Sequence, residues 1–110
     1  MALKHARLLE VIDLHASDEE RGTSMSSSLL KTDRLQLMQV VLPAGAGLPE
    51  HHVAGEITIQ CLVGEAKVVT PRQTCQLAVG QLVALPGGEP HAVQAIRDST
   101  LLVTVLRESS

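Results

Sequence analysis

The 110-residue chain contains no Phe, Tyr or Trp. Its core must therefore be built from aliphatic side chains and Met, and it offers no aromatic platform on which a base, a sugar or a flavin could stack. Nine Lys and Arg face twelve Asp and Glu, and no basic run occurs. This balance argues against nucleic acid and anionic membrane surfaces as partners. No apolar run approaches the roughly 20 residues that span a bilayer.

Cysteine is also scarce, with only Cys61 and Cys75. Two cysteines are too few for a disulfide framework, so both are expected to be small buried hydrophobes in a reducing compartment. The opening stretch "MALKHARLLEVIDLH" is interrupted by Glu10 and Asp13 before a signal-peptide core could form. A cytoplasmic location is the expectation that follows.

The composition, with 45% hydrophobic and 19% charged residues, is that of one globular domain. Residues 1–28 are predicted to form an N-terminal arm. Its first 16 residues have mixed apolar spacing, which fits a short helix or a strand, and "HASDEERGTSMSSS" over 15–28 is typical of a loop. Residues 29–110 are predicted to form the folded barrel.

Strand periodicity begins within "LLKTDRLQLMQVVLP", where residues 35–42 alternate between two faces up to Pro43. Short β-rich runs separated by turn residues follow at 56–63, 65–70, 74–79, 81–85, 91–96 and 100–106. This spacing predicts an all-β protein, an antiparallel sandwich or small barrel. The nearly continuous apolar runs "LLVTVL" and "QLVALP" indicate strands packed on both faces, as in a barrel wall covered by a dimer partner.

The most distinctive pattern is "GQLVALPGGEPHAVQA" over 80–95, in which a Pro-Gly-Gly turn leads into His91. The prolines stiffen this turn and the glycines permit positive φ, so the histidine stands on a rigid support. The stretch resembles the second motif of the cupin superfamily, G-x5-P-x-G-x2-H-x3-N. The residues that fit are Gly80, Pro86, Gly88 and His91, and Ala95 replaces the final Asn. The resemblance implies a small single-domain cupin with the double-stranded β-helix, or jelly-roll, fold over about residues 30–106.

The first cupin motif, G-x5-H-x-H-x3/4-E-x6-G, fits less well. Anchoring it on Gly45 and Gly64 places His51 at the first histidine, whereas the longer internal spacing places Glu50 there and His52 at the second histidine. Both registers put Ile57 where the family has its metal-binding glutamate. Glu56 is one residue away and would need a bulge to turn inward, because a one-residue shift reverses the face.

Two interpretations of "LPEHHVAGE", residues 48–56, remain open. In the first, His51, His52, His91 and Glu50 (or Glu56) hold a divalent transition metal such as Fe, Mn, Ni, Cu or Zn. In the second there is no metal, and the histidines lie at a solvated rim. On a regular strand only one of the adjacent histidines points inward. We expect that residue to be His52, which shares a face with Glu50, although the register anchored on Gly45 and Gly64 favours His51.

The resemblance implies a fold that supports many activities. We expect a barrel that binds a small-molecule ligand, with or without a metal cofactor, in a non-catalytic sensor or accessory role. The alternative is a metal-dependent oxygenase or isomerase, and a purely structural dimer is a third class. Because an aliphatic barrel of this size has a limited core, and "LLEVIDL" could cover a neighbour's sheet edge, a homodimer is expected.

Overall fold

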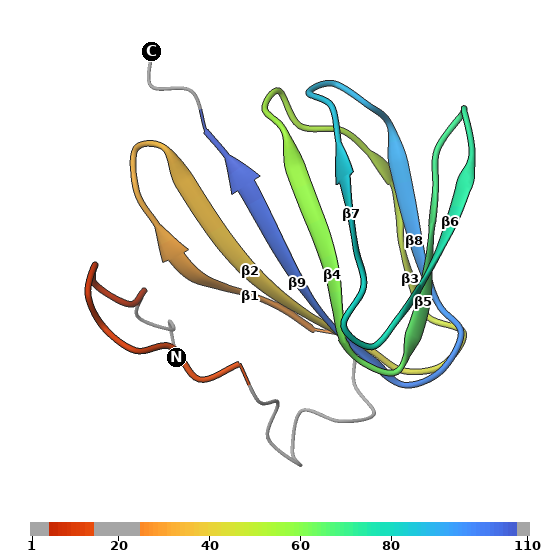
Figure 1. Cartoon of the computed structure of the whole chain (residues 1–110), viewed down its shortest axis with the longest axis horizontal. Coiled ribbons are helices and arrows are strands. Elements are labelled where there is room, and N and C mark those ends of the chain that lie inside the picture. Colours follow the sequence, from red (N-terminus) through yellow and green to blue (C-terminus); the bar gives the residue numbers. More distant parts are fainter. Residues whose placement is uncertain (1–4, 15–24, 108–110) are drawn as a thin grey trace.

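The computed structural model describes residues 5–14 and 25–107, and within them the chain is a sandwich of two antiparallel sheets (Figure 1). The larger sheet has the order β1-β2-β9-β4-β7 and the smaller one β3-β8-β5-β6. The strands are β1 (Met25–Lys31), β2 (Leu35–Leu42), β3 (Gly47–His51), β4 (Ile57–Val63), β5 (Glu65–Val69), β6 (Thr74–Ala78), β7 (Leu82–Leu85), β8 (His91–Ala95) and β9 (Ser99–Leu106). The all-β class expected from the turn spacing is confirmed.

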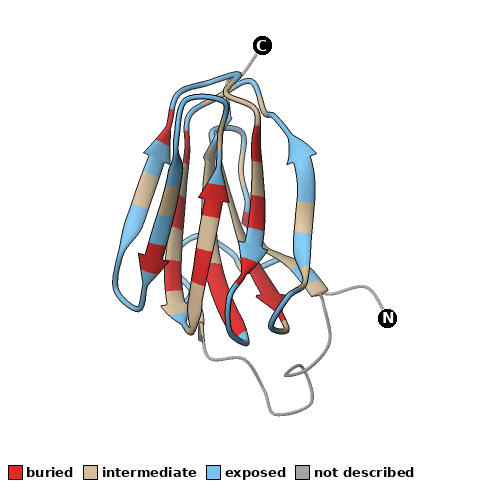
Figure 2. Cartoon of the chain, turned by 90° about the vertical axis from the view of Figure 1, so that its right-hand side faces the viewer, coloured by how far each residue is buried: buried red, intermediate tan, exposed pale blue. Residues whose placement is uncertain are grey.

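The core lies between the two sheets and is aliphatic. Buried residues alternate with intermediate or exposed ones along β4, β5 and β8, and Figure 2 shows such alternation of colours along the strands. This period of two puts one face of each strand inward. The buried cluster is Val40, Leu42, Ile57, Ile59, Cys61, Ala66, Val68, Leu77, Leu85, Val93, Ala95 and Leu101. Mainly aliphatic side chains thus fill the interior, without any Phe, Tyr or Trp.

The glycines that anchor the motif comparison have a conformational role. Gly45, Gly64, Gly80 and Gly88 are the glycines with positive φ in the described part of the chain. At Gly64, between β4 and β5, the Cβ atom of any other residue would also lie 2.2 Å from the Asp98 backbone oxygen. Only glycine suits that turn, because any side chain would be both strained and obstructed.

Three segments differ from the sequence expectation. No strand was predicted where β3 lies. β1 begins at Met25, inside the stretch expected to be a loop, because Ser26, Ser27 and Ser28 pair with β2. Pairing with a neighbouring strand outweighs the low intrinsic β-propensity of such a stretch. Residues 5–14 form neither the helix nor the strand considered for them, and contain a turn at Leu8 and Leu9. Across the described residues, no helix has the length and apolar character needed to cross a bilayer.

Candidate functional site

Two histidines meet at one end of the smaller sheet. His91 is the first residue of β8, and His51 is the last of β3, directly opposite it in the antiparallel pairing. The register shifts between Leu48 and His51. Leu48 and His51 are an odd number of positions apart, yet both lie opposite inward-facing residues of β8. The bulge is what turns the His51 side chain to the same face as His91.

The two imidazole rings are in contact, with centroids 4.4 Å apart and planes tilted by 57°. His91 is only 1% exposed, whereas His51 is exposed at the rim. Nδ1 of His91 lies 3.0 Å from the Glu89 backbone oxygen, and Nδ1 of His51 lies 3.2 Å from that of Pro49. A carbonyl oxygen can only accept, so both Nδ1 atoms donate. In the neutral rings, each Nε2 therefore keeps a free lone pair.

The other predicted site residues do not join this pair. Glu50 precedes His51 within the bulged part of β3, and His52 lies just beyond the end of the strand. Both are exposed, as is Glu56. The structure pairs His51, rather than the expected His52, with His91. Within residues 5–14 and 25–107, no group of three or more His, Cys, Asp or Glu side chains is placed to hold a metal ion.

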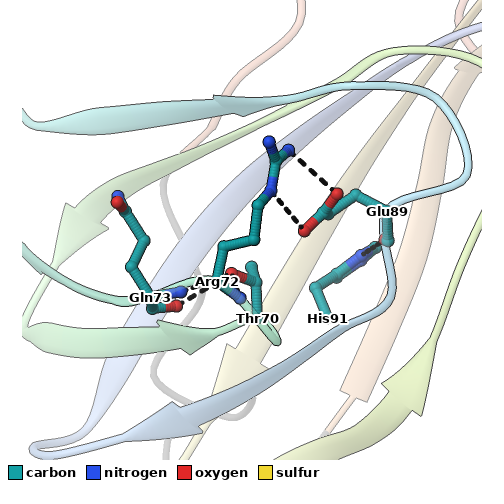
Figure 3. Close-up of polar contacts among 5 residues, drawn as sticks. All are labelled: Thr70, Arg72, Gln73, Glu89 and His91. Carbon is teal, nitrogen blue, oxygen red and sulfur yellow. Dashed lines mark hydrogen bonds and ion pairs between the residues drawn. The ribbon is translucent and has the colours of Figure 1, made fainter.

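An ion pair stands beside His91 (Figure 3). The Arg72 guanidinium, on the turn between β5 and β6, contacts both carboxylate oxygens of Glu89, with Nη2–Oε1 at 3.0 Å and Nε–Oε2 at 3.2 Å. The Glu89 side chain is 14% exposed and that of Arg72 69%. Glu89 thus has two roles, because its backbone oxygen orients His91 while its carboxylate links the turn before β8 to the turn after β5.

A hollow of about 210 Å³ adjoins this ion pair where the edges of the two sheets, β6 and β7, face each other. Polar and apolar side chains both line it, the composition usual for small-molecule sites. The lining residues are Thr70, Arg72, Gln73, Cys75, Val83, Ala84, Leu85, Pro86 and Glu89. Because Val69 pairs with Ala92, Thr70 lies on the next rung of the sheet, beside His91. The hollow therefore begins beside His91, while its lining includes neither histidine.

The two cysteines differ from the expectation that both are buried. Cys61 is fully buried, and its thiol donates to the Val63 backbone oxygen at 3.3 Å. Burial raises the pKa of the Cys61 thiol, the hydrogen bond to Val63 opposes this, and the Glu65 carboxylate adds to it. Cys75 is half-buried, lines the hollow and accepts a hydrogen bond from Gln73 Nε2 at 3.2 Å.

Sequence reasoning found the histidines and missed the ion pair. Glu89 stands two residues before His91 in "GGEPH", a spacing that marks its carboxylate as a neighbour of the histidine. Arg72 is distant in sequence and belongs to a turn that a Thr70 hydroxyl organises by accepting from the backbone N–H groups of Arg72 and Gln73. A single sequence does not show which other turn the β5–β6 turn faces in the folded protein.

Neither protein-family models nor curated proteins match the chain. Solved structures, by contrast, do match the chain. A conserved protein of unknown function from Streptococcus pyogenes is 22% identical with a TM-score of 0.78, and the match covers 100% of this chain and 97% of the other. A cupin superfamily protein from Desulfitobacterium hafniense is 20% identical, with a TM-score of 0.78 and coverages of 98% and 100%.

An RmlC-like cupin with a double-stranded β-helix fold, from Methanocaldococcus jannaschii, is 19% identical with a TM-score of 0.75, and the match covers 92% of this chain and 94% of the other. At this level of sequence identity, the similarity shows a shared fold alone. The chain therefore has the double-stranded β-helix fold expected from its second motif, and its structural neighbours are small single-domain proteins of the RmlC-like cupin superfamily.

Proposed function

We propose that this protein binds a small molecule at the end of the barrel where His51 and His91 meet, in a non-catalytic sensor or accessory role. The observation that carries the proposal is the fixed orientation of both rings by backbone carbonyl oxygens. Two Nε2 lone pairs held next to a hollow form a preorganised acceptor pair. Such a pair suits a ligand that donates hydrogen bonds, such as an alcohol, a phenol or an amide.

The hollow beside the pair supports a ligand of modest size. Its volume of about 210 Å³ lies below the range usual for drug-sized ligands. Val83 and Leu85 supply an apolar lining for a short hydrocarbon part, and the polar end of the ligand extends past Thr70 towards His91. The Arg72–Glu89 ion pair leaves little net charge at the rim. A neutral polar ligand therefore fits better than a strongly charged one.

A metal-dependent oxygenase or isomerase is a second candidate, favoured by one observation. An imidazole whose Nδ1 donates to a carbonyl presents Nε2 in the form that a transition metal binds. His51 and His91 fit two positions of such an ion. They do not make a complete set of protein ligands, since Glu50 and His52 would have to turn from their exposed places. We therefore assign no reaction step to a metal.

The test of the first candidate is a thermal-shift screen of small alcohols, phenols and amides, followed by calorimetry on the compounds that raise the melting temperature. Removing the buried acceptor in His91→Ala should weaken their binding by about tenfold or more, the effect of one lost hydrogen bond in a partly buried site. His51→Ala should weaken it less, because that ring is exposed. The matched control, His52→Ala, should bind as the parent does.

Binding that survives His91→Ala unchanged would place the ligand elsewhere and refute the proposal. The second candidate is tested separately, by elemental analysis of protein purified without a histidine tag. Stoichiometric metal in the parent that disappears in His91→Ala would support it. Absence of metal in both proteins would remove it while leaving the first candidate intact.

A further inference from the structure

The hollow between the edges of β6 and β7 is lined by two kinds of residue that come from different elements. Arg72 and Gln73 belong to the turn before β6 and Cys75 to β6 itself, whereas the apolar residues 83–86 belong to β7 and the turn after it. The volume of about 210 Å³ equals that of about seven molecules of liquid water. A small molecule can therefore place a polar group against the first set and a hydrocarbon part against the second.

The Arg72 guanidinium has more donors than its ion pair uses. The planar group has two usable sides, and Glu89 occupies one of them by accepting from Nε and Nη2. In the described part of the chain, Nη1 makes no hydrogen bond, and Figure 3 shows this terminal nitrogen on the side away from Glu89. The free N–H groups of Nη1 and Nη2 form a second fork, which can hold one more acceptor oxygen.

Gln73 supplies an acceptor to the same hollow. Its Nε2 atom donates to Cys75 Sγ at 3.2 Å, which ties the side-chain amide to another residue of the lining. Its Oε1 atom can only accept, and it makes no hydrogen bond to residues 5–14 or 25–107. The turn itself is held in place, because the backbone N–H groups of Arg72 and Gln73 both donate to the Thr70 hydroxyl, at 3.3 and 3.1 Å.

The charges of the lining favour a neutral ligand. Among the lining residues, Arg72 and Glu89 are the basic and the acidic one, and their charges cancel. A carboxylate at the free side of Arg72 would lie near the Glu89 carboxylate and would have no cation of its own. The Glu89 side chain is only 14% exposed, so water and salt screen this repulsion less than at an open surface.

We infer that this hollow binds the neutral carboxamide group of a small molecule, and that Arg72 and Gln73 determine this specificity. A carboxamide carries a carbonyl oxygen and an N–H group on neighbouring atoms, which complement the free fork of Arg72 and the Oε1 atom of Gln73. The second N–H of a primary amide is the group that extends past Thr70 towards His91. The inference rests on the proposed function, because it selects amides from the ligands considered there.

The first test compares small molecules that share an isopropyl group, with binding followed by NMR chemical-shift titration. Isobutyramide should bind most tightly. Methyl isopropyl ketone lacks the N–H, isobutanol lacks the carbonyl, and isobutyrate brings a charge. Each should bind about threefold to tenfold more weakly, the effect of one lost hydrogen bond. Isobutanol that binds as tightly as isobutyramide would overturn the inference and leave the proposed function intact.

The second test assigns the carboxamide N–H to Gln73. Gln73→Ala should weaken isobutyramide binding about threefold to tenfold and leave the binding of methyl isopropyl ketone unchanged, because the ketone donates nothing to Oε1. The matched control is Gln76→Ala, at an exposed position of β6 that pairs with Lys67 and lies outside the hollow. It should bind both compounds as the parent does. Equal losses for both compounds in Gln73→Ala would contradict this role.

The third test assigns the carbonyl oxygen to Arg72 through the charge of its partner. Glu89→Gln keeps the shape of the side chain and removes its charge, so Arg72 becomes an uncompensated cation. Isobutyrate should then bind more tightly than isobutyramide, the reverse of the order in the parent. An ion pair with a purely structural role would weaken both ligands alike. An unchanged order in Glu89→Gln would therefore overturn the assignment of Arg72.

The place of binding can be read from Cys75, which lines the hollow. Saturating isobutyramide should slow the reaction of Cys75 with methyl methanethiosulfonate, a small thiol reagent without a carboxamide. Binding without this protection would place the ligand elsewhere and overturn the inference. Binding that requires His91 but is unaffected by Gln73→Ala and Glu89→Gln would also overturn it, while the proposed function would stand. Binding unaffected by His91→Ala would refute the proposed function, and with it the ligand class assigned to that site.

Discussion

Cys61 and Cys75 have the same side chain but lie in different environments. Burial and a raised thiol pKa keep Cys61 protonated, and the thiolate is the reactive form. Cys75 is half-buried at the hollow. We predict that a thiol reagent such as iodoacetamide modifies Cys75 in the native protein and reaches Cys61 only on unfolding. Peptide mass spectrometry measures both rates, and equal native rates would contradict the burial of Cys61.

The same residue affects stability at high pH. A thiol whose pKa is raised in the folded state holds its proton more firmly than in the unfolded chain, whose value is 9.0. Between the unfolded and the folded pKa, the folded state binds more protons, so the free energy of unfolding falls as pH rises. Below pH 9.0 this group has little effect. The decline above it should be smaller in Cys61→Ala, which removes the titrating group.

At the scale of elements, the turn between β4 and β5 depends on Gly64. Both its φ of 85° and the approach of the Asp98 backbone oxygen oppose a side chain. Gly80 has a φ of 87°, and a Cβ atom at that position would meet open space. Gly80→Ala should therefore cost only the left-handed conformation, about 1–2 kcal/mol. We predict that Gly64→Ala lowers the melting temperature clearly more, and equal losses would show that the close approach has no energetic effect.

Elements that carry their own signal were predictable from sequence. The runs that became β4 to β9 alternate or end at turn residues, and the Pro86 turn before His91 was recognised from its residues. β3 was not predicted as a strand, because "GLPEH" contains Gly and Pro and pairs only through a bulge. That bulge also decided that His51 meets His91. Such a choice depends on cross-strand register, which local sequence does not encode.

At the scale of the whole molecule, the two sheets have different tasks. The smaller sheet supplies both histidines, and its β5–β6 turn supplies Arg72. The larger sheet supplies the uncharged outer face and holds the arm.

The sheet order also predicts how the molecule opens. β9 lies at the centre of the larger sheet between β2 and β4, and Leu101 on β9 is fully buried. β3 is an edge strand with a bulge, and its residues are largely exposed. Amides exchange through local openings where few buried contacts hold a segment, and through global unfolding at the core. We expect amide exchange to be slowest in β9 and β4 and orders of magnitude faster in β3. Hydrogen exchange followed by NMR measures this directly.

If β3 were as protected as β9, the end of the barrel with His51 would be rigid on that timescale, and ligand entry would require another route. Fast exchange in β3 would instead show that the strand carrying His51 opens while His91, on its paired strand β8, stays in place.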